Sequence, residues 1–111
     1  MNILEELNDI FSDIGIPLET GIFLDTAPDE YIVIVPLSDT YGFHADDKPN
    51  ADVQGARISI YSKGNYMSAK KKVVNKLLEE DFTITDRKYI TYETDTGYHH
   101  YAVDVEKNYE P

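Results

Sequence analysis

Two groups of side chains have residue types that could bind a metal ion. His99 and His100 are adjacent, and His44 lies close to the paired carboxylates Asp46 and Asp47. Adjacent residues of a β-strand point to opposite faces, so His99 and His100 are not expected to share one ion. A site of His44, Asp46 and one of the two strand histidines is the alternative, although no spacing demands it. We therefore predict no metal site.

Paired carboxylates are the next candidates for chemistry. A glycosidase needs two carboxylates held in a pocket, one of them with a raised pKa. The pairs here, Asp46-Asp47 and the run 79–81, fall where solvent-exposed charge is expected. The chain has no cysteine, which excludes a thiolate nucleophile, and it has no glycine-rich phosphate loop. We predict that the protein is not an enzyme and uses no cofactor, with a small enzyme or metal-binding domain as the least favoured hypothesis.

The charge of the chain is strongly negative. Its 111 residues include 21 acidic side chains against 10 lysines and arginines, a net charge of −11. Such a surface repels nucleic acid and disfavours binding in a DNA groove. The same charge could line a passage through which DNA slides, could mimic DNA for a basic partner, or could simply keep the protein soluble.

The elements that would position these side chains are organised around one strand and one helix. Alternating apolar residues predict a strand at Val53–Ser62, and a narrow apolar stripe predicts a helix at Asn65–Glu80. A second stripe predicts an amphipathic helix at Asn2–Ile14, with Asn2 as its N-cap. A helix with one apolar face buries that face against another element. Here the predicted sheet is available to both helices, which indicates a two-layer core.

The remaining strands follow from alternation and turn residues. A hairpin turn at 95–97 connects the last two strands, and a bend or bulge is expected within 83–88. The expected strands are Gly21–Asp25, Tyr31–Leu37, Phe82–Thr94 and Tyr98–Lys107, in addition to Val53–Ser62. The predicted fold class is α+β: a single two-layer domain over residues 1–111, mainly an antiparallel β-sheet with two helices packed on one face, in the order α-β-β-loop-β-α-β-β.

The segment between Ser38 and Asp52 is predicted to be a long polar loop. Long loops in small domains are usually functional or disordered, and the aromatic side chains in this one favour contact with a partner, with a flap packed on its own protein as the alternative. Tyrosine is enriched at protein interfaces, and this chain has nine. The candidate interface residues are Tyr41, Phe43, His44, Asp46, Asp47, Lys70, Lys71, Tyr98 and Tyr101.

The arrangement of elements resembles a known family. The features are the N-terminal amphipathic helix, the polar segment 38–52, the strand Ala56–Ser62, the helix Ser68–Leu78 and the final hairpin that ends in Tyr101–Val105. In this order they resemble the tail-terminator and tail-to-head joining proteins, or tail completion proteins, of long-tailed, non-contractile bacteriophages and prophages. The resemblance covers nearly the whole chain and is architectural, without a catalytic signature.

The resemblance implies a structural role in virion assembly. Members of that family form hexameric rings that cap the tail tube and join it to the head connector. It implies partners of three kinds: further copies of this chain, a tail tube protein and a head connector protein. DNA would pass through the ring without being specifically bound, and no membrane would be involved. The protein would be located in the tail or neck of the virion, and in the host bacterial cytoplasm during assembly.

The alternative function is that of a small acidic DNA mimic or inhibitor that binds a basic protein. A DNA mimic needs its carboxylates spread along one face at the spacing of phosphates. In this chain the carboxylates are scattered among both predicted helices, the segment 38–52 and the last hairpin, which weakens this hypothesis.

Overall fold

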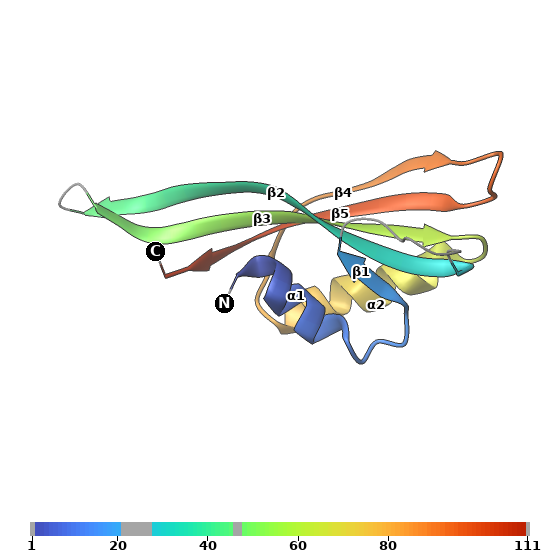
Figure 1. Cartoon of the computed structure of the whole chain (residues 1–111), viewed down its shortest axis with the longest axis horizontal. Helices are drawn as coiled ribbons and strands as arrows, with labels where there is room; N and C mark the ends of the chain where they lie inside the picture. Colours follow the sequence, from blue (N-terminus) through green and yellow to red (C-terminus); the bar gives the residue numbers. More distant parts are fainter. Residues whose placement is uncertain (1, 21–27, 46–47, 111) are drawn as a thin grey trace.

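The computed structural model describes residues 2–20, 28–45 and 48–110, with the backbone alone for 19–20, 41–45 and 48–50 (Figure 1). Two helices and five strands follow one another along the chain. They are α1 (Ile3–Phe11), β1 (Leu18–Thr20), β2 (Glu30–Ala45), β3 (Lys48–Ser62), α2 (Tyr66–Glu79), β4 (Thr83–Tyr92) and β5 (His99–Tyr109).

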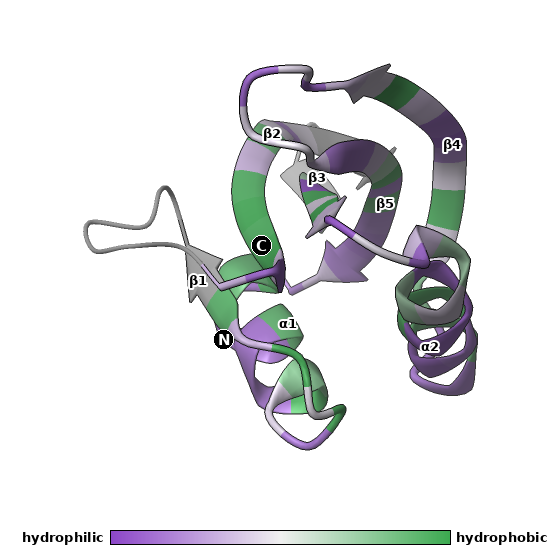
Figure 2. Ribbon diagram, turned by 90° about the vertical axis from the view of Figure 1, so that its right-hand side faces the viewer, coloured by the Kyte–Doolittle hydropathy of each residue, from purple (hydrophilic) through white to green (hydrophobic). Residues whose placement is uncertain are grey.

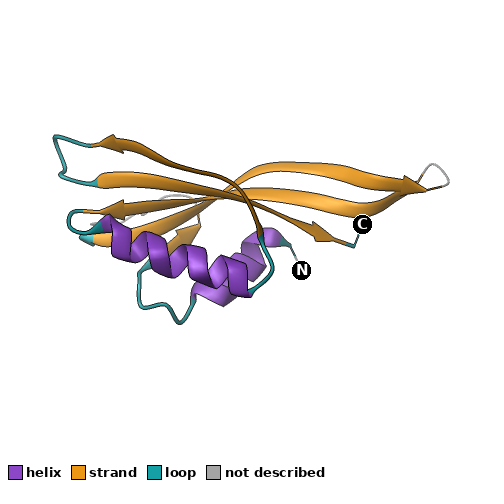
Figure 3. Ribbon diagram, turned by 180° about the vertical axis from the view of Figure 1, so that it is seen from behind, coloured by secondary structure: helices purple, strands orange, loops and turns teal. Residues whose placement is uncertain are grey.

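The strands form one sheet in the order β1-β2-β3-β5-β4. Three of its pairings are antiparallel, and only the short β1 is parallel to its neighbour β2. Both helices lie on the same face of the sheet (Figure 3). The predicted fold class is therefore confirmed. The predicted strand Gly21–Asp25 lies outside the described residues.

The core lies between the two helices and the sheet. On β3, Ile58 and Ile60 face the helices, as the alternation predicts, and both are fully buried. Each helix contributes one stripe of the same cluster, which contains Ile3, Leu7 and Phe11 from α1 and Ala69, Val73 and Leu77 from α2. These stripes repeat at helical spacing, which is why the sequence forms helices here and not strands.

Asparagine side chains begin both helices. The carboxamide oxygen of Asn2 accepts a hydrogen bond from the backbone N–H of Glu5 at 2.9 Å, and that of Asn65 accepts one from Met67 at 3.1 Å. Each bond satisfies an amide that has no partner within the helix. Asn2 therefore caps α1 as expected from the sequence, and Asn65 caps α2.

The predicted loop 38–52 is wrong. Ser38–Ala45 continue β2 and Lys48–Asp52 begin β3, and the two strands pair from Ser38↔Gly55 as far as Ala45↔Lys48. We call this hairpin, Ser38–Ala45 with Lys48–Gly55, the β2–β3 arm. It projects from one end of the molecule, which measures 53 × 25 × 24 Å (Figure 1). Its apolar alternation is weak because the arm extends beyond the core, yet backbone hydrogen bonds still pair its strands.

Strand β4 is irregular. Its register with β5 shifts between Ile84 and Asp86 and again between Tyr89 and Thr91. A bulge inserts one residue and reverses the side-chain alternation after it. The first shift confirms the bulge expected within 83–88. After the first shift, Arg87 and Tyr89 lie opposite Val103 and Tyr101, on the side of the sheet that faces the helices.

Candidate interaction site

The predicted interface residues of the polar segment belong to the β2–β3 arm. Tyr41 lies opposite Asp52 and His44 opposite Pro49 in the register of the arm, with Phe43 between them on β2. Asp46 and Asp47 lie outside the described residues. The arm accompanies β5 as far as the pair Asp52↔Tyr109, and beyond this pair its described part has two strands. The contact of these residues with a partner stays a prediction.

Two of the predicted interface tyrosines are buried within the chain itself. Tyr98 and Tyr101 are each 7% exposed. The hydroxyl of Tyr98 donates a hydrogen bond to the backbone oxygen of Pro28 at 2.5 Å, and the ring of Tyr101 stacks on that of Tyr66 at 5.9 Å between centroids. A side chain in such a position has little surface left for a partner. We therefore correct the prediction that Tyr98 and Tyr101 form an interface.

The two adjacent histidines lie on opposite faces of the sheet. The ring of His100 stacks on Tyr61 at 4.3 Å, on the face away from the helices, whereas Nδ1 of His99 is 2.9 Å from the hydroxyl of Tyr89. Burial lowers the pKa of His100, and its Nε2 is buried without a hydrogen-bond partner among the described residues. Within that part of the chain, no three His, Cys, Asp or Glu side chains gather as a metal site would require.

Burial also changes the acidity of the neighbouring aromatic groups. Tyr31 stacks on Tyr61 with ring centroids 4.8 Å apart. Burial of its hydroxyl, together with the nearby Tyr61, raises the pKa of Tyr31 to about 12. A tyrosine that is harder to ionise is a poor general base at neutral pH. Tyr31, Tyr61 and His100 therefore form a packed cluster of stacked aromatic rings.

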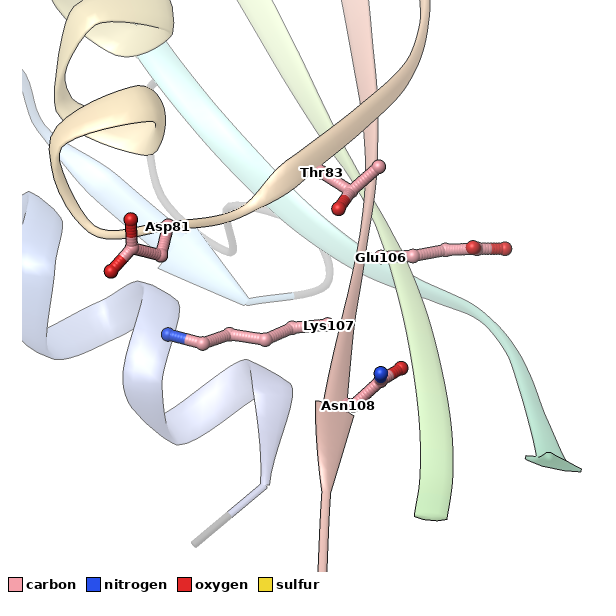
Figure 4. A pocket seen from close by; sticks show the side chains of 5 residues that line it. All are labelled: Asp81, Thr83, Glu106, Lys107 and Asn108. Atoms are coloured by element: carbon pink, nitrogen blue, oxygen red, sulfur yellow. The ribbon is translucent and has the colours of Figure 1, made fainter. Parts of the chain in front are cut away.

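A shallow pocket lies near the end of α2, and the only lysine in its lining is neutralised by an ion pair. It has a volume of about 290 Å³ and is lined by Asp81, Thr83, Glu106, Lys107 and Asn108 (Figure 4). The ammonium of Lys107 points out of this group toward α1, where it forms an ion pair with Glu6 and donates to the backbone oxygen of Glu80 at 3.0 Å. With its cation used in this way, the pocket has no group that would attract an anion.

A second groove lies between α2 and β4 and has a different character. Its volume is about 360 Å³, and its lining residues are Met67, Lys70, Lys71, Val74, Asn75 and Arg87. We call it the α2–β4 groove. Three cations and two apolar side chains surround it. Lys70 and Lys71 were predicted as interface residues from the sequence, and the structure places both of them in this groove.

The cations of the α2–β4 groove differ in their surroundings. The ammonium of Lys70 lies 4.8 Å from the centroid of the Tyr101 ring, in cation–π geometry. Lys71 and Arg87 are exposed and form no ion pair with any side chain that the structure describes. By contrast, Lys76 and Lys107 are each paired with a carboxylate. The groove therefore holds positive charge that the described residues leave uncompensated.

Exposed aromatic and apolar side chains lie on the elements that form the groove. Tyr89, Ile90 and Tyr92 on β4 and Met67 on α2 are all exposed. Tyrosine, methionine and arginine are the residue types enriched at protein interfaces. Sequence analysis missed Arg87 because the register shifts of β4 decide which face it occupies. The one available signal was the expectation of a bulge within 83–88.

No protein-family model matches the chain, and no curated protein matches it. Neither helix in the described ranges is long and apolar enough to cross a membrane.

Proposed function

We propose that the protein is a structural subunit of a phage or prophage virion, which forms a ring that caps the tail tube and joins it to the head connector. The single observation that carries the proposal is the β2–β3 arm. Beyond the pair Asp52↔Tyr109 the arm projects past the layer of helices, and its described strands there pair only with each other (Figure 1). An isolated two-stranded hairpin is marginally stable in water, so an arm of this length is best explained by a neighbour that covers it.

The base of the arm supports the same proposal. Val35 and Leu37 are exposed, by 38% and 49%, although both are large and apolar. The predicted strand Tyr31–Leu37 is apolar on both faces, which favours cover on both sides, by helices or by another subunit. The two helices cover the face of Ile32 and Ile34, and on the other face Val33 is buried whereas Val35 stays exposed. A second subunit of a ring would supply the missing cover.

The charge of the chain is consistent with a channel for DNA. A ring of subunits with a net charge of −11 each repels the phosphate backbone and allows DNA to slide without being held. The role of the protein is then binding and closure, without a reaction. Its partners are copies of itself, the tail tube protein and the head connector protein.

The experiment is a measurement of mass by light scattering against protein concentration, with negative-stain images of the largest species. We expect growth toward a closed ring, and hexamers are the expected size. A variant in which an Asn-Gly turn replaces residues 41–52 joins Thr40 to Val53, which already lie opposite each other. It should keep the fold, as judged by circular dichroism, and lose the ring.

Two results would overturn the proposal. One is a wild-type protein that stays monomeric up to millimolar concentration and shows no rings. The other is a shortened variant that assembles as well as the wild type, because the arm would then have no role in the contact.

A further inference from the structure

We propose that the α2–β4 groove binds the acidic outer face of helix α1 of a second copy of this chain. The inference rests on the proposed ring, and it names the surfaces that meet between neighbouring subunits. Both surfaces are formed by described residues, and neither belongs to the β2–β3 arm. The contact can therefore be tested separately from the arm.

The groove is open to a partner because α1 of the same chain lies on the other side of α2. Lys76 faces the segment just after α1, where its ammonium lies 3.8 Å from a carboxylate oxygen of Asp13. Lys70, Lys71 and Val74 are rotated away from Lys76 around the helix, toward β4. The cations of Lys71 and Arg87 are therefore directed away from the acidic residues of their own α1.

The matching surface is the outer face of α1. Its buried stripe contains Leu7, and on the opposite side of the helix are Glu5 and Asp9. Both carboxylates are exposed, four residues apart on one face, and neither has an ion-pair partner among the described residues. Residues at this spacing are neighbours about 6 Å apart along the helix. Two adjacent carboxylates would thus meet the cations of Lys71 and Arg87.

The relative positions of the two surfaces favour a repeating contact. Helix α1 lies under the β1 and β2 side of the sheet, and α2 lies under β4 on the opposite side (Figure 2). A contact between two different surfaces of one chain is heterologous, and it forms a closed ring when the rotation between subunits permits. The apolar side chains of Met67 and Val74 in the groove would be covered at the same time.

Charge complementarity favours a second copy as the occupant. The chain carries a large excess of acid, and its exposed cations concentrate on α2 and β4. Two copies that approached at random would repel each other, whereas the orientation with α1 facing the groove brings opposite charges together. This orientation thus provides specificity as well as attraction.

The test exchanges the charges of the two surfaces. Variant one carries Lys71→Glu and Arg87→Glu, and variant two carries Glu5→Lys and Asp9→Lys. Each variant alone places like charges in contact and should weaken self-association by at least about tenfold in dissociation constant, measured by sedimentation at low salt. An equimolar mixture pairs the acidic groove of variant one with the basic helix of variant two, and should recover assembly in alternating order.

The matched control is the double substitution Lys72→Glu with Lys88→Glu. It changes the net charge by the same amount as variant one, on the same two elements. Lys72 does not line the groove, and Lys88 lies opposite Ala102 on the face away from the helices. The control should associate markedly more tightly than variant one. Recovery in the mixture also requires both variants to be folded, so misfolding cannot imitate it.

The outcomes separate this inference from the proposed function. Equal weakening by variant one and by the control, or a mixture that fails to reassemble, would overturn the inference while the ring of the wild type stands. Failure of the wild type to assemble at all would overturn both. We expect each variant by itself to remain unassembled, and the equimolar mixture to assemble.

Discussion

Arg57 and Asp104 lie directly opposite each other on β3 and β5, and the guanidinium donates two hydrogen bonds to the carboxylate. Nε and Nη2 of Arg57 donate to the two oxygens of Asp104 at 2.7 and 3.1 Å. Asp86 of β4 lies on the other side of Asp104 in the same row. The arginine therefore offsets the repulsion between two aspartates on neighbouring strands, and it joins the central pairing of the sheet.

Removal of one member of this pair should destabilise the fold. We expect Asp104→Ala to lower the free energy of unfolding by about 1–3 kcal/mol, because a partly buried guanidinium loses the partner of two hydrogen bonds. Asp29→Ala is the control, since the pair of Asp29 with Lys63 is exposed and long, at 3.8 Å, and should change stability by less than about 0.5 kcal/mol. Urea titrations measure both. Equal changes in the free energy of unfolding for the two substitutions would show that the hydrogen bonds of Arg57 stabilise the fold no more than an exposed ion pair does.

The end of α2 provides a substitution that should increase stability. Asp81 adopts a left-handed conformation with φ of 63°, while the N–H of Phe82 donates to the oxygen of Leu77 at 3.0 Å and that of Asp81 to Leu78 at 3.3 Å. These are the two hydrogen bonds of a Schellman motif, whose left-handed position favours glycine. Asp81→Gly should therefore raise the free energy of unfolding by about 0.5–1 kcal/mol.

A second substitution at the same position separates conformation from charge. Asp81→Ala removes the carboxylate from the helix C-terminus just as glycine does, but it keeps a Cβ in the left-handed region. Thermal unfolding should give the order Gly above Asp above Ala. If alanine stabilised the protein as much as glycine, the unfavourable charge at the helix end would be the cause and the backbone argument would be wrong.

The core elements of the fold could be predicted because their patterns depend on burial. The stripe of α1 and the alternation of Ile58 and Ile60 repeat at the periods of a helix and a strand, and both elements are found with ends shifted by a few residues. In α2 the apolar stripe of the sequence is wider than the face that the fold buries. Leu78 belongs to the stripe but is 59% exposed. Periodicity locates a helix and only approximately defines its buried face.

The arm and the groove could not be predicted in the same way. In the β2–β3 arm, strands are maintained by backbone pairing outside the core, so the side chains carry little of the alternation that marks a strand. In the groove, the position of Arg87 depends on a bulge, and one inserted residue transfers the side chains that follow it, as far as the second shift after Tyr89, to the other face. Lys70 and Lys71 were accessible to sequence analysis because they follow the regular period of α2.

The contrast between two leucines on the helices tests the boundary of the core. Leu7 is fully buried between α1 and the sheet, whereas Leu78 is exposed at the end of α2. Leu7→Ala should lower the free energy of unfolding by about 2–5 kcal/mol, through lost burial and the cavity that remains. Leu78→Ala should change it by less than about 0.5 kcal/mol. A large loss of stability for Leu78→Ala would place that side chain in a contact between subunits. The loss should then disappear when the unfolding measurement is repeated at high dilution.

The acid sensitivity of the fold should depend on His100. Burial against Tyr61 lowers the pKa of His100 in the folded protein below its ordinary value of 6.5, with Arg57 acting in the same direction and Glu93 opposing it. Below about pH 6.5 the unfolded chain takes up a proton that the folded chain resists, so stability is lost as the pH falls, until the folded histidine also becomes protonated.

The substitution His100→Phe keeps a ring against Tyr61 and removes the titration. Its free energy of unfolding should therefore decline less than that of the wild type between pH 7.5 and pH 5, because the carboxylates common to both proteins contribute equally. His100→Gln, which lacks the ring, should show the same flattened pH profile at a lower overall stability, and this separates protonation from stacking. Urea titrations at each pH supply the comparison. Parallel pH profiles for the wild type and His100→Phe would show that the buried Nε2 of His100 has no part in acid sensitivity.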